Sequence, residues 1–235
     1  MRSIVGIMML TSILFADDHT LSKQSDTSKP RATALSQGQT VMEDFNREYE
    51  SARKDKGGCL WREEDWKKAE GDSEYGKLMD RICEAENIAM DLANKDRKRF
   101  CKNPLILDQR LAYVSRLNSL RVIKEGGVRH TNPHNGWYAG QPQKWFKDFF
   151  PAAAKVIKFE RENMWGMGGG DAQKINAGTL ANQATTSWIH SPGHHAPMID
   201  CNNRYAGVGF MYDPKRNEWL GFMSFGELAT SKIPF

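Results

Sequence analysis

Trp188-Ile-His-Ser-Pro-Gly-His-His195, followed by Ala206-Gly-Val-Gly-Phe210, is the most informative part of this chain. The first segment places histidines on a Pro-Gly turn after a helix-like stretch, and the second segment has a strand-like pattern. Binding groups concentrate on loops that a rigid scaffold holds, so this turn can direct imidazoles into a cleft. The sequence therefore indicates a fold and a candidate site more clearly than a function.

The length and composition are those of a single globular domain with an extension. The chain has 235 residues, of which 40% are hydrophobic and 26% are charged, and this is enough to build a sizeable core. The net charge is +4 with mixed signs. Because no long Lys/Arg run stands out, the sequence does not indicate a nucleic-acid partner.

The N-terminus has the pattern of an export signal. Residues 1–16 are predicted to be a signal peptide, since a short apolar run follows Arg2 and Ala16 is a plausible cleavage point. The run is too short to span a membrane as a helix, and no later segment is long and apolar enough to do so. We therefore expect a secreted, periplasmic or extracellular protein without a transmembrane segment in its mature chain.

Two segments separate this signal from the main domain. Residues 17–40 are rich in small polar residues and are predicted to be a disordered linker. Residues 41–79 are strongly charged and helical in pattern. Trp61 and Trp66 could dock this extension on the main body, but a solvated helical arm is the favoured interpretation.

Four cysteines fit an exported protein with two disulfides. If 83–101 is one helix, Cys83 and Cys101 lie about 27 Å apart at about 1.5 Å per residue, too far for a disulfide, whose Cα atoms lie within roughly 7 Å. Cys59 is then joined to one of these two cysteines and Cys201 to the other.

Residues 80–235 are predicted to form an α+β domain, because helical patterns come first and strand patterns come late. Helices are expected over 80–101, over 111–123 after an N-cap at Asp108, and after an N-cap at Asp171. A hairpin is expected over 205–225. The aromatic-rich segment 131–158 is predicted to mix loop and short helix, and Gly166–Gly170 to form a flexible loop.

Four landmarks in order make residues 80–226 resemble the CAP superfamily of cysteine-rich secretory, antigen 5 and pathogenesis-related proteins, also called SCP-like extracellular proteins. The similarity is closest to the bacterial branch. The landmarks are Ala85-Glu-Asn87 with Pro104-Leu-Ile-Leu-Asp108, Gly127-Val-Arg-His130, Arg161-Glu-Asn-Met164, and Trp188 with Ser191-Pro-Gly-His194 and Gly207-Val-Gly209.

The resemblance implies a three-layer α-β-α sandwich with a cleft that can bind a divalent metal such as zinc. The implied cleft residues are His130, Glu162 and His194, with the two histidines as candidate metal ligands. Two imidazoles and a carboxylate can hold zinc and leave a position for water. The second glutamate of the family is missing after Trp188, as is usual in the bacterial branch.

Other polar residues near the motifs are expected to have supporting roles. Asn163 and Ser191 are predicted to line the cleft and to hydrogen-bond loop backbone, because short polar side chains favour such bonds. His134, His190 and His195 are expected to be exposed, with His190 as the reserve ligand.

Three functions remain open. The favoured one is an exported, non-enzymatic CAP-domain protein that binds a lipid, glycan, peptide or divalent metal in its His/Glu cleft. The first alternative is a metal-dependent hydrolase that uses His130, Glu162 and His194. The second alternative is a structural or interaction protein of the cell envelope that docks through residues 41–79 on an envelope or host component.

Overall fold

The computed structural model describes residues 31–53, 58–126, 131–132, 136–137 and 141–229. The helices are α1 (Arg31–Arg53), α2 (Glu63–Gly71), α3 (Ser73–Arg97), α4 (Gln109–Lys124), α5 (Gln141–Phe149), α6 (Ala153–Val156), α7 (Ala177–His190), α8 (Pro192–Ile199) and the 3-10 turn η2 (Ala172–Lys174). The strands are β1 (Ile106–Leu107), β2 (Thr131–Asn132), β3 (Gly136–Trp137), β4 (Ile157–Gly168), β5 (Asn203–Asp213) and β6 (Glu218–Leu228).

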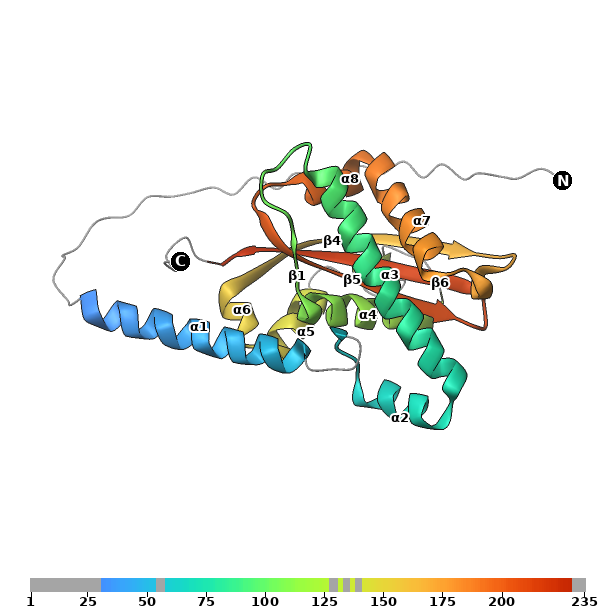
Figure 1. The fold of residues 1–235 in the computed structure, drawn as a ribbon, viewed down its shortest axis with the longest axis horizontal. Helices are drawn as coiled ribbons and strands as arrows, with labels where there is room; N and C mark the ends of the chain where they lie inside the picture. The colour runs from blue at the N-terminus through green and yellow to red at the C-terminus, as the bar shows by residue number, and fades with distance from the viewer. Residues whose placement is uncertain (1–30, 54–57, 127–130, 133–135, 138–140, 230–235) are drawn as a thin grey trace.

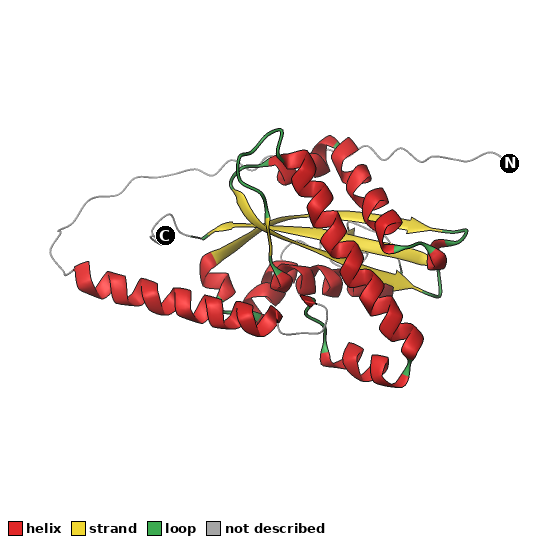
Figure 2. Cartoon of the chain, in the orientation of Figure 1, coloured by secondary structure: helices red, strands yellow, loops and turns green. Residues whose placement is uncertain are grey.

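A four-stranded sheet forms the middle layer of the domain. Its strand order is β1-β5-β6-β4, with β1 parallel to β5 and the other neighbours antiparallel. Helix α4 covers one face, whereas α3, α7 and α8 lie on the other (Figure 2). The predicted α+β sandwich with three layers is therefore confirmed.

Glycines in β5 let α4 approach the sheet closely. A Cβ atom at Gly207 would lie 2.1 Å from the backbone nitrogen of Ala112, and one at Gly209 would lie 2.3 Å from that of Arg116. The Ser115 hydroxyl bonds the Gly207 carbonyl at 3.0 Å. Helix and sheet thus meet backbone to backbone, which only residues without a side chain permit.

Helix boundaries follow the capping residues. The predicted cap at Asp108 is confirmed, since its carboxylate accepts from the backbone N–H groups of Arg110 and Leu111. Asp72 caps α3 in the same way, so this helix starts at Ser73, earlier than predicted. The predicted cap at Asp171 is wrong. Asn176 caps α7 instead by accepting from the N–H of Thr179 at 2.8 Å, because only Asn176 directly precedes the first helical turn.

Strand β4 was not predicted from the sequence. Ile157-Lys-Phe-Glu160 alternates apolar and charged residues, but the polar run Arg161-Glu-Asn163 breaks the pattern, and the strand is irregular between Phe159 and Arg161. The expected flexible loop at Gly166–Gly170 is correct only for its end: β4 continues to Gly168, and Gly169 and Gly170 turn the chain with positive φ. The C-terminal hairpin is confirmed as β5 and β6, with Asn217 at φ 50° in its turn.

The N-terminal extension packs on the domain, so the favoured solvated arm is wrong. Phe45, Cys59 and Trp61 are 7%, 0% and 6% exposed and belong to the two main hydrophobic clusters. These side chains bury apolar area that a solvated arm would leave in water. The end of the extension, from Ser73, is the first part of α3, and α1 begins at Arg31, inside the segment expected to be a linker.

Charged groups fix α1 against α4 and α6 (Figure 1). The fully buried Arg110 pairs with Asp108 and Glu48, and its guanidinium lies 4.3 Å from the ring centroid of Phe45. Glu48 also accepts from the backbone N–H groups of Ala152 and Ala153. The carboxylate therefore satisfies otherwise unpaired amides at the start of α6.

The disulfides are Cys59–Cys83 and Cys101–Cys201. This pairing confirms the exclusion of Cys83–Cys101 and resolves the alternative that the sequence left open. Both bonds connect α3 or its C-terminal turn to segments that are distant in the sequence. Within the part of the chain that is described, no helix is long and apolar enough to cross a membrane.

Candidate functional site

Glu162 lies on β4, on the face of the sheet that α4 covers. It pairs in register with Ser224, whose hydroxyl lies 2.8 Å from that of Ser115 on α4. Both carboxylate oxygens of Glu162 are 2.9 Å from the side-chain amide nitrogen of Asn118, which donates to them. Strand alternation thus directs this carboxyl toward the α4 layer.

Burial dominates the electrostatics of Glu162. Loss of solvent raises the pKa of Glu162 to about 7, although the Asn118 hydrogen bond and the positive charge of Arg121 oppose the rise. Arg121 is itself shared with Asn118 and Glu125. The carboxyl therefore changes its protonation near neutral pH, which favours a binding or proton-handling role.

Asn163 points to the opposite face of the sheet, toward α8. It pairs in register with Met223, a member of the core cluster that α3 and α7 share. Its amide nitrogen donates to the backbone carbonyl of His194 at 2.7 Å. The predicted role of Asn163 in bonding backbone fits this contact, which fixes α8 against β4.

Ser191 and His194 are brought together at the junction of α7 and α8. The carbonyl of Ser191 accepts from the N–H groups of His194 at 3.0 Å and of His195 at 2.8 Å. This bonding starts α8 directly after α7, with Pro192 at its first position, where a missing N–H costs nothing. The Pro-Gly turn of the sequence motif is therefore the first turn of a helix.

The structure does not place every predicted residue. His130 and His134 lie outside the described residues, so the pair His130 and His194 stays a prediction. Within the described ranges, no three His, Cys, Asp or Glu side chains gather as a metal site would require. Glu162 and the backbone of His194 approach β4 from opposite faces. Since β4 is the outer strand of the sheet, a site that includes both must close around its free edge.

Two polar contacts near the motifs were not predicted from the sequence: Asn118 with Glu162, and Asp96 with His195. Asn118 is fully buried on α4, four residues after Val114 and seven after Leu111, and a polar residue in that apolar stripe was a usable signal. His195, expected to be exposed, is half-buried and lies 2.6 Å from the carboxylate of Asp96. Burial, and then the charge of Arg99, lowers the pKa of His195.

Helix α7 carries the tryptophan of the motif and no acidic residue. Trp188 is fully buried, and its indole N–H donates to the carbonyl of Met164 on β4 at 3.1 Å. The residues that follow it in α7 are Ile189 and His190. The helix therefore supplies packing and position to the site but no second carboxylate.

The family model of the cysteine-rich secretory protein family, CAP, matches residues 90–224, more than half of the chain. This protein belongs to the CAP family. The match includes α4, β4, α7, α8 and β5, the elements that carry the candidate residues with their supports. It confirms the resemblance found in the sequence motifs.

Two solved structures that are similar to this chain come from bacteria. An outer surface protein from Borrelia burgdorferi is 16% identical, with a TM-score of 0.44, over 60% of this chain and 91% of that chain. An extracellular protein containing a SCP domain from Bacillus anthracis str. Ames is 20% identical, with a TM-score of 0.38, over 59% of this chain and 39% of that chain. No curated protein matches this chain.

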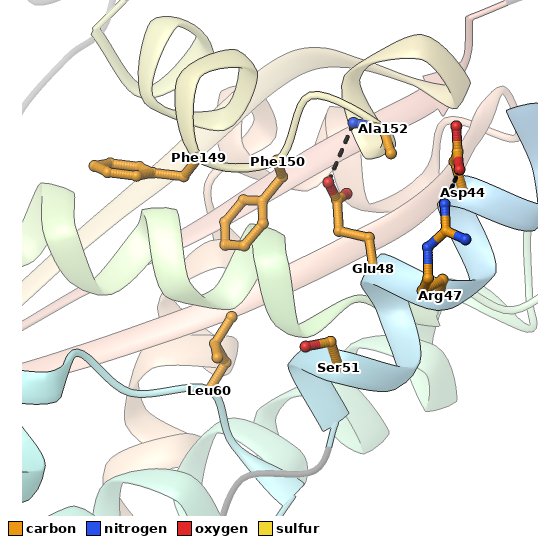
Figure 3. A pocket seen from close by; sticks show the side chains of 8 residues that line it. All are labelled: Asp44, Arg47, Glu48, Ser51, Leu60, Phe149, Phe150 and Ala152. Atoms are coloured by element: carbon orange, nitrogen blue, oxygen red, sulfur yellow. Dashed lines mark hydrogen bonds and ion pairs between the residues drawn. The ribbon is translucent and has the colours of Figure 1, made fainter.

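A groove of about 490 Å³ lies between α1 and the end of α5, and none of the candidate cleft residues lines it (Figure 3). Its charged groups are already used: Asp44 pairs with Arg47, and Glu48 bonds the amides of α6. The remaining lining includes Phe149 and Phe150. This groove is therefore a seam between the N-terminal helix and the CAP domain, in which the charged groups serve the structure.

The raised pKa of Glu162 predicts a pH-dependent stability. Since its folded pKa of about 7 lies above the ordinary value of 4.5, its contribution is fully present below about pH 4.5 and is lost as the pH rises through 7. The free energy of unfolding should fall by up to about 1.4 kcal/mol per pH unit in this window for one proton. Glu162→Gln should remove the part of this pH dependence that Glu162 contributes, as measured by the free energy of urea unfolding at pH 5 and pH 8.

The matched control is Glu160→Gln, which changes a carboxyl that pairs with Lys158 on the same strand and leaves Glu162 in place. Glu86, which burial also raises to a pKa of about 7, adds a similar slope to the parent and to both variants. A Glu162→Gln variant that keeps the full pH slope of the parent would show that this carboxyl is solvated.

Proposed function

We propose that this protein is an exported CAP-domain protein that acts by binding a small ligand at the free edge of β4, and not by catalysis. Glu162 is the central residue of this site, with His194 and the sequence-predicted His130 as its neighbours. The observation that carries the proposal is a half-buried carboxyl whose hydrogen-bond partner among the described residues is an amide, and whose pKa lies near neutrality.

Export is supported by the cysteines and by the N-terminus. All four cysteines are in disulfides, which persist in oxidising compartments outside the cytosol. The apolar segment predicted to be a signal peptide agrees with this. The family name itself describes secretory proteins.

The state of Glu162 supports binding of a polar group. Asn118 uses one acceptor position on each carboxylate oxygen, and each oxygen has a second lone pair. A carboxyl that is partly protonated at neutral pH can donate a hydrogen bond as well as accept one. Such a group suits the hydroxyl or carbonyl groups of a glycan, a peptide or a lipid headgroup.

A non-catalytic role is favoured because the acidic residues are too few. Helix α7 lacks a carboxylate after Trp188, and Glu162 is held by Asn118 instead of by a base. Acid–base catalysis generally needs a positioned acid and a positioned base. Glu162, the one carboxyl that the described residues contribute to the proposed cleft, is better suited to recognition.

A divalent metal is one form that the ligand could take. Glu162, His130 and His194 would hold it, and a bound zinc ion would supply Lewis acidity at an open coordination position. The described residues alone do not provide three such donors. The metal form of the proposal therefore depends on His130.

The test is calorimetric titration of zinc into the chain from Asp17 onward, beside Glu162→Gln, His130→Ala and His194→Ala. The metal form predicts one site, weakened at least about tenfold in each variant, because each loses a ligand. Glu160→Gln is the control and should bind as the parent does. Zinc binding that is equal in all proteins would place the metal elsewhere.

If the parent does not bind zinc, the metal form is wrong and the organic form is tested directly. Thermal shifts are then measured with an oligosaccharide, a short peptide and a short-chain phospholipid. One of these should raise the melting temperature of the parent but not that of Glu162→Gln. If each probe stabilises both proteins equally, or neither protein, Glu162 is not part of a binding site.

A further inference from the structure

The connection between α3 and β1 exposes an aromatic side chain in a basic surrounding. Phe100 is 49% exposed. Four cationic residues close to it in the sequence are also exposed: Lys95, Lys98, Arg99 and Lys102. Exposing a large apolar side chain forgoes the free energy that its burial would give, and here the exposed ring lies among exposed cations. We refer to residues 95–102 as the basic loop.

Part of the positive charge of the basic loop is balanced locally, since the buried carboxylate of Asp96 pairs with Arg99 and also meets His195. Lys95, Lys98 and Lys102 form no ion pair with an acidic side chain of the described residues, so their charges stay available at the surface. Beyond the end of α3 at Arg97 the chain makes one further hydrogen-bonded turn, in which the N–H of Cys101 donates to the carbonyl of Arg97. Lys95, Lys98 and Arg99 therefore have the three- and four-residue spacing that places side chains on one side of a helix.

A rigid base holds the basic loop. Arg97 is fully buried and donates to the backbone carbonyls of four residues at 2.7 to 2.9 Å; these residues are Asn103, Met198, Asp200 and Asn203. The disulfide Cys101–Cys201 joins Cys101, the residue after Phe100, to the segment that follows α8. Figure 1 shows this connection at the periphery of the molecule, beside α8. The exposure of Phe100 thus comes from a braced backbone.

Neighbouring side chains also fix the orientation of the Phe100 ring. Its ring meets the imidazole of His195 edge to face, with the centroids 5.4 Å apart. The Arg99 guanidinium lies over the same ring, 5.5 Å from its centroid. The imidazole in turn is held by Asp96. Each of these contacts orders the ring while leaving half of it in water.

We propose that the basic loop is a docking surface for an anionic lipid membrane. The exposed cations meet lipid phosphates, and Phe100 enters the interface between headgroups and acyl chains. Basic side chains near an anionic surface each add to the attraction, and an apolar side chain beside them adds burial. Nucleic acid is a poorer match, because single-stranded binding uses several aromatic side chains as stacking platforms, and this loop presents one.

The experiment is sedimentation with phosphatidylcholine vesicles, with and without about one third phosphatidylglycerol, using the chain from Asp17 onward. The parent should bind only the anionic vesicles, and binding should weaken as salt screens the charges. Lys98→Ala/Lys102→Ala should weaken the partition roughly 25-fold, since each cation contributes about fivefold. Phe100→Ala should weaken it roughly fivefold, because half of a phenyl ring is withdrawn from the interface.

Matched controls remove the same groups elsewhere. Lys67→Ala/Lys77→Ala deletes two exposed cations that pair with Glu63 and Glu74, so the net charge changes equally. Phe149→Ala removes a phenylalanine that is 51% exposed on α5. Both should bind anionic vesicles as the parent does, and unchanged melting temperatures should verify that all variants are folded.

Three results would overturn the proposal. The first is a parent that does not bind the anionic vesicles. The second is a control that loses as much binding as its loop variant, which would mean that binding follows net charge or general hydrophobicity. The third is a Phe100→Ala variant that binds vesicles fully while the loop cations govern binding to a single-stranded oligonucleotide, which would identify a soluble polyanion as the partner.

Discussion

Gly209→Ala should destabilise the protein by at least about 3 kcal/mol, which is the upper range for overpacking a core. The new Cβ atom would lie 2.3 Å from the backbone nitrogen of Arg116 and 2.6 Å from the backbone carbon of Ser115. Neither backbone atom can move without shifting α4. The expected result is a large fall in the midpoint of urea unfolding, measured by circular dichroism.

The consequence extends beyond the contact itself. A shift of α4 would stretch the bond from the Ser119 hydroxyl to the Gly209 carbonyl, now 3.1 Å. It would also disturb the buried pair of Arg116 with Glu86, whose other oxygen accepts from the N–H of Phe210. Burying a charge whose partner has moved is costly. The loss should therefore exceed that of an ordinary single-methyl insertion.

Gly193→Ala is the control for Gly209→Ala. At Gly193 no atom lies within 4 Å of the added Cβ, and the residue has no positive φ. This substitution should leave the stability within about 0.5 kcal/mol of the parent or raise it slightly. If Gly209→Ala were equally neutral, α4 would not contact β5 backbone to backbone.

Cys101→Ala/Cys201→Ala should destabilise the protein by about 4 to 5 kcal/mol, since this disulfide closes a loop of about 100 residues in the unfolded chain. Its two cysteines are separated by 100 positions in the sequence. Unfolding in urea without a reducing agent measures the effect. Because this bond braces the basic loop, the same variant should also bind anionic vesicles more weakly.

The other disulfide provides the comparison. Cys59 and Cys83 are separated by only 24 positions, so Cys59→Ala/Cys83→Ala should cost about 3.5 kcal/mol. The order of the two losses tests the entropic explanation. A larger loss for the shorter loop would mean that packing around the fully buried Cys59 dominates, and that chain entropy does not.

The N-terminal extension shows what periodicity can and cannot predict. Its charged pattern correctly predicted helices. Whether these helices pack on the domain depends on partners that are distant in the sequence. Arg110 lies between Phe45 and Tyr49 of α1, and the guanidinium of Arg116 lies 4.4 Å from the ring centroid of Trp61. Deleting residues 41–79 would therefore remove part of the core, so such a deletion cannot isolate an envelope-docking role.

The sequence by itself determined the local elements and the family. The cap at Asp108 and the alternating hairpin are fixed by residues that are neighbours in the chain. Helix length also excluded one cysteine pairing. The order of short motifs identified the CAP family before any contact was known.

The tertiary structure alone decided strand β4 and the surroundings of Glu162. The polar run Arg161-Glu-Asn163 interrupts the alternation that marks a half-buried strand, so the full length of β4 emerges only from its pairing with β6. The partner of Glu162 is Asn118, 44 residues away, and Asp96 meets His195 across 99 residues. Such pairs are fixed by how layers pack, because burial and hydrogen bonding act between groups that are close in space, whatever their separation along the chain.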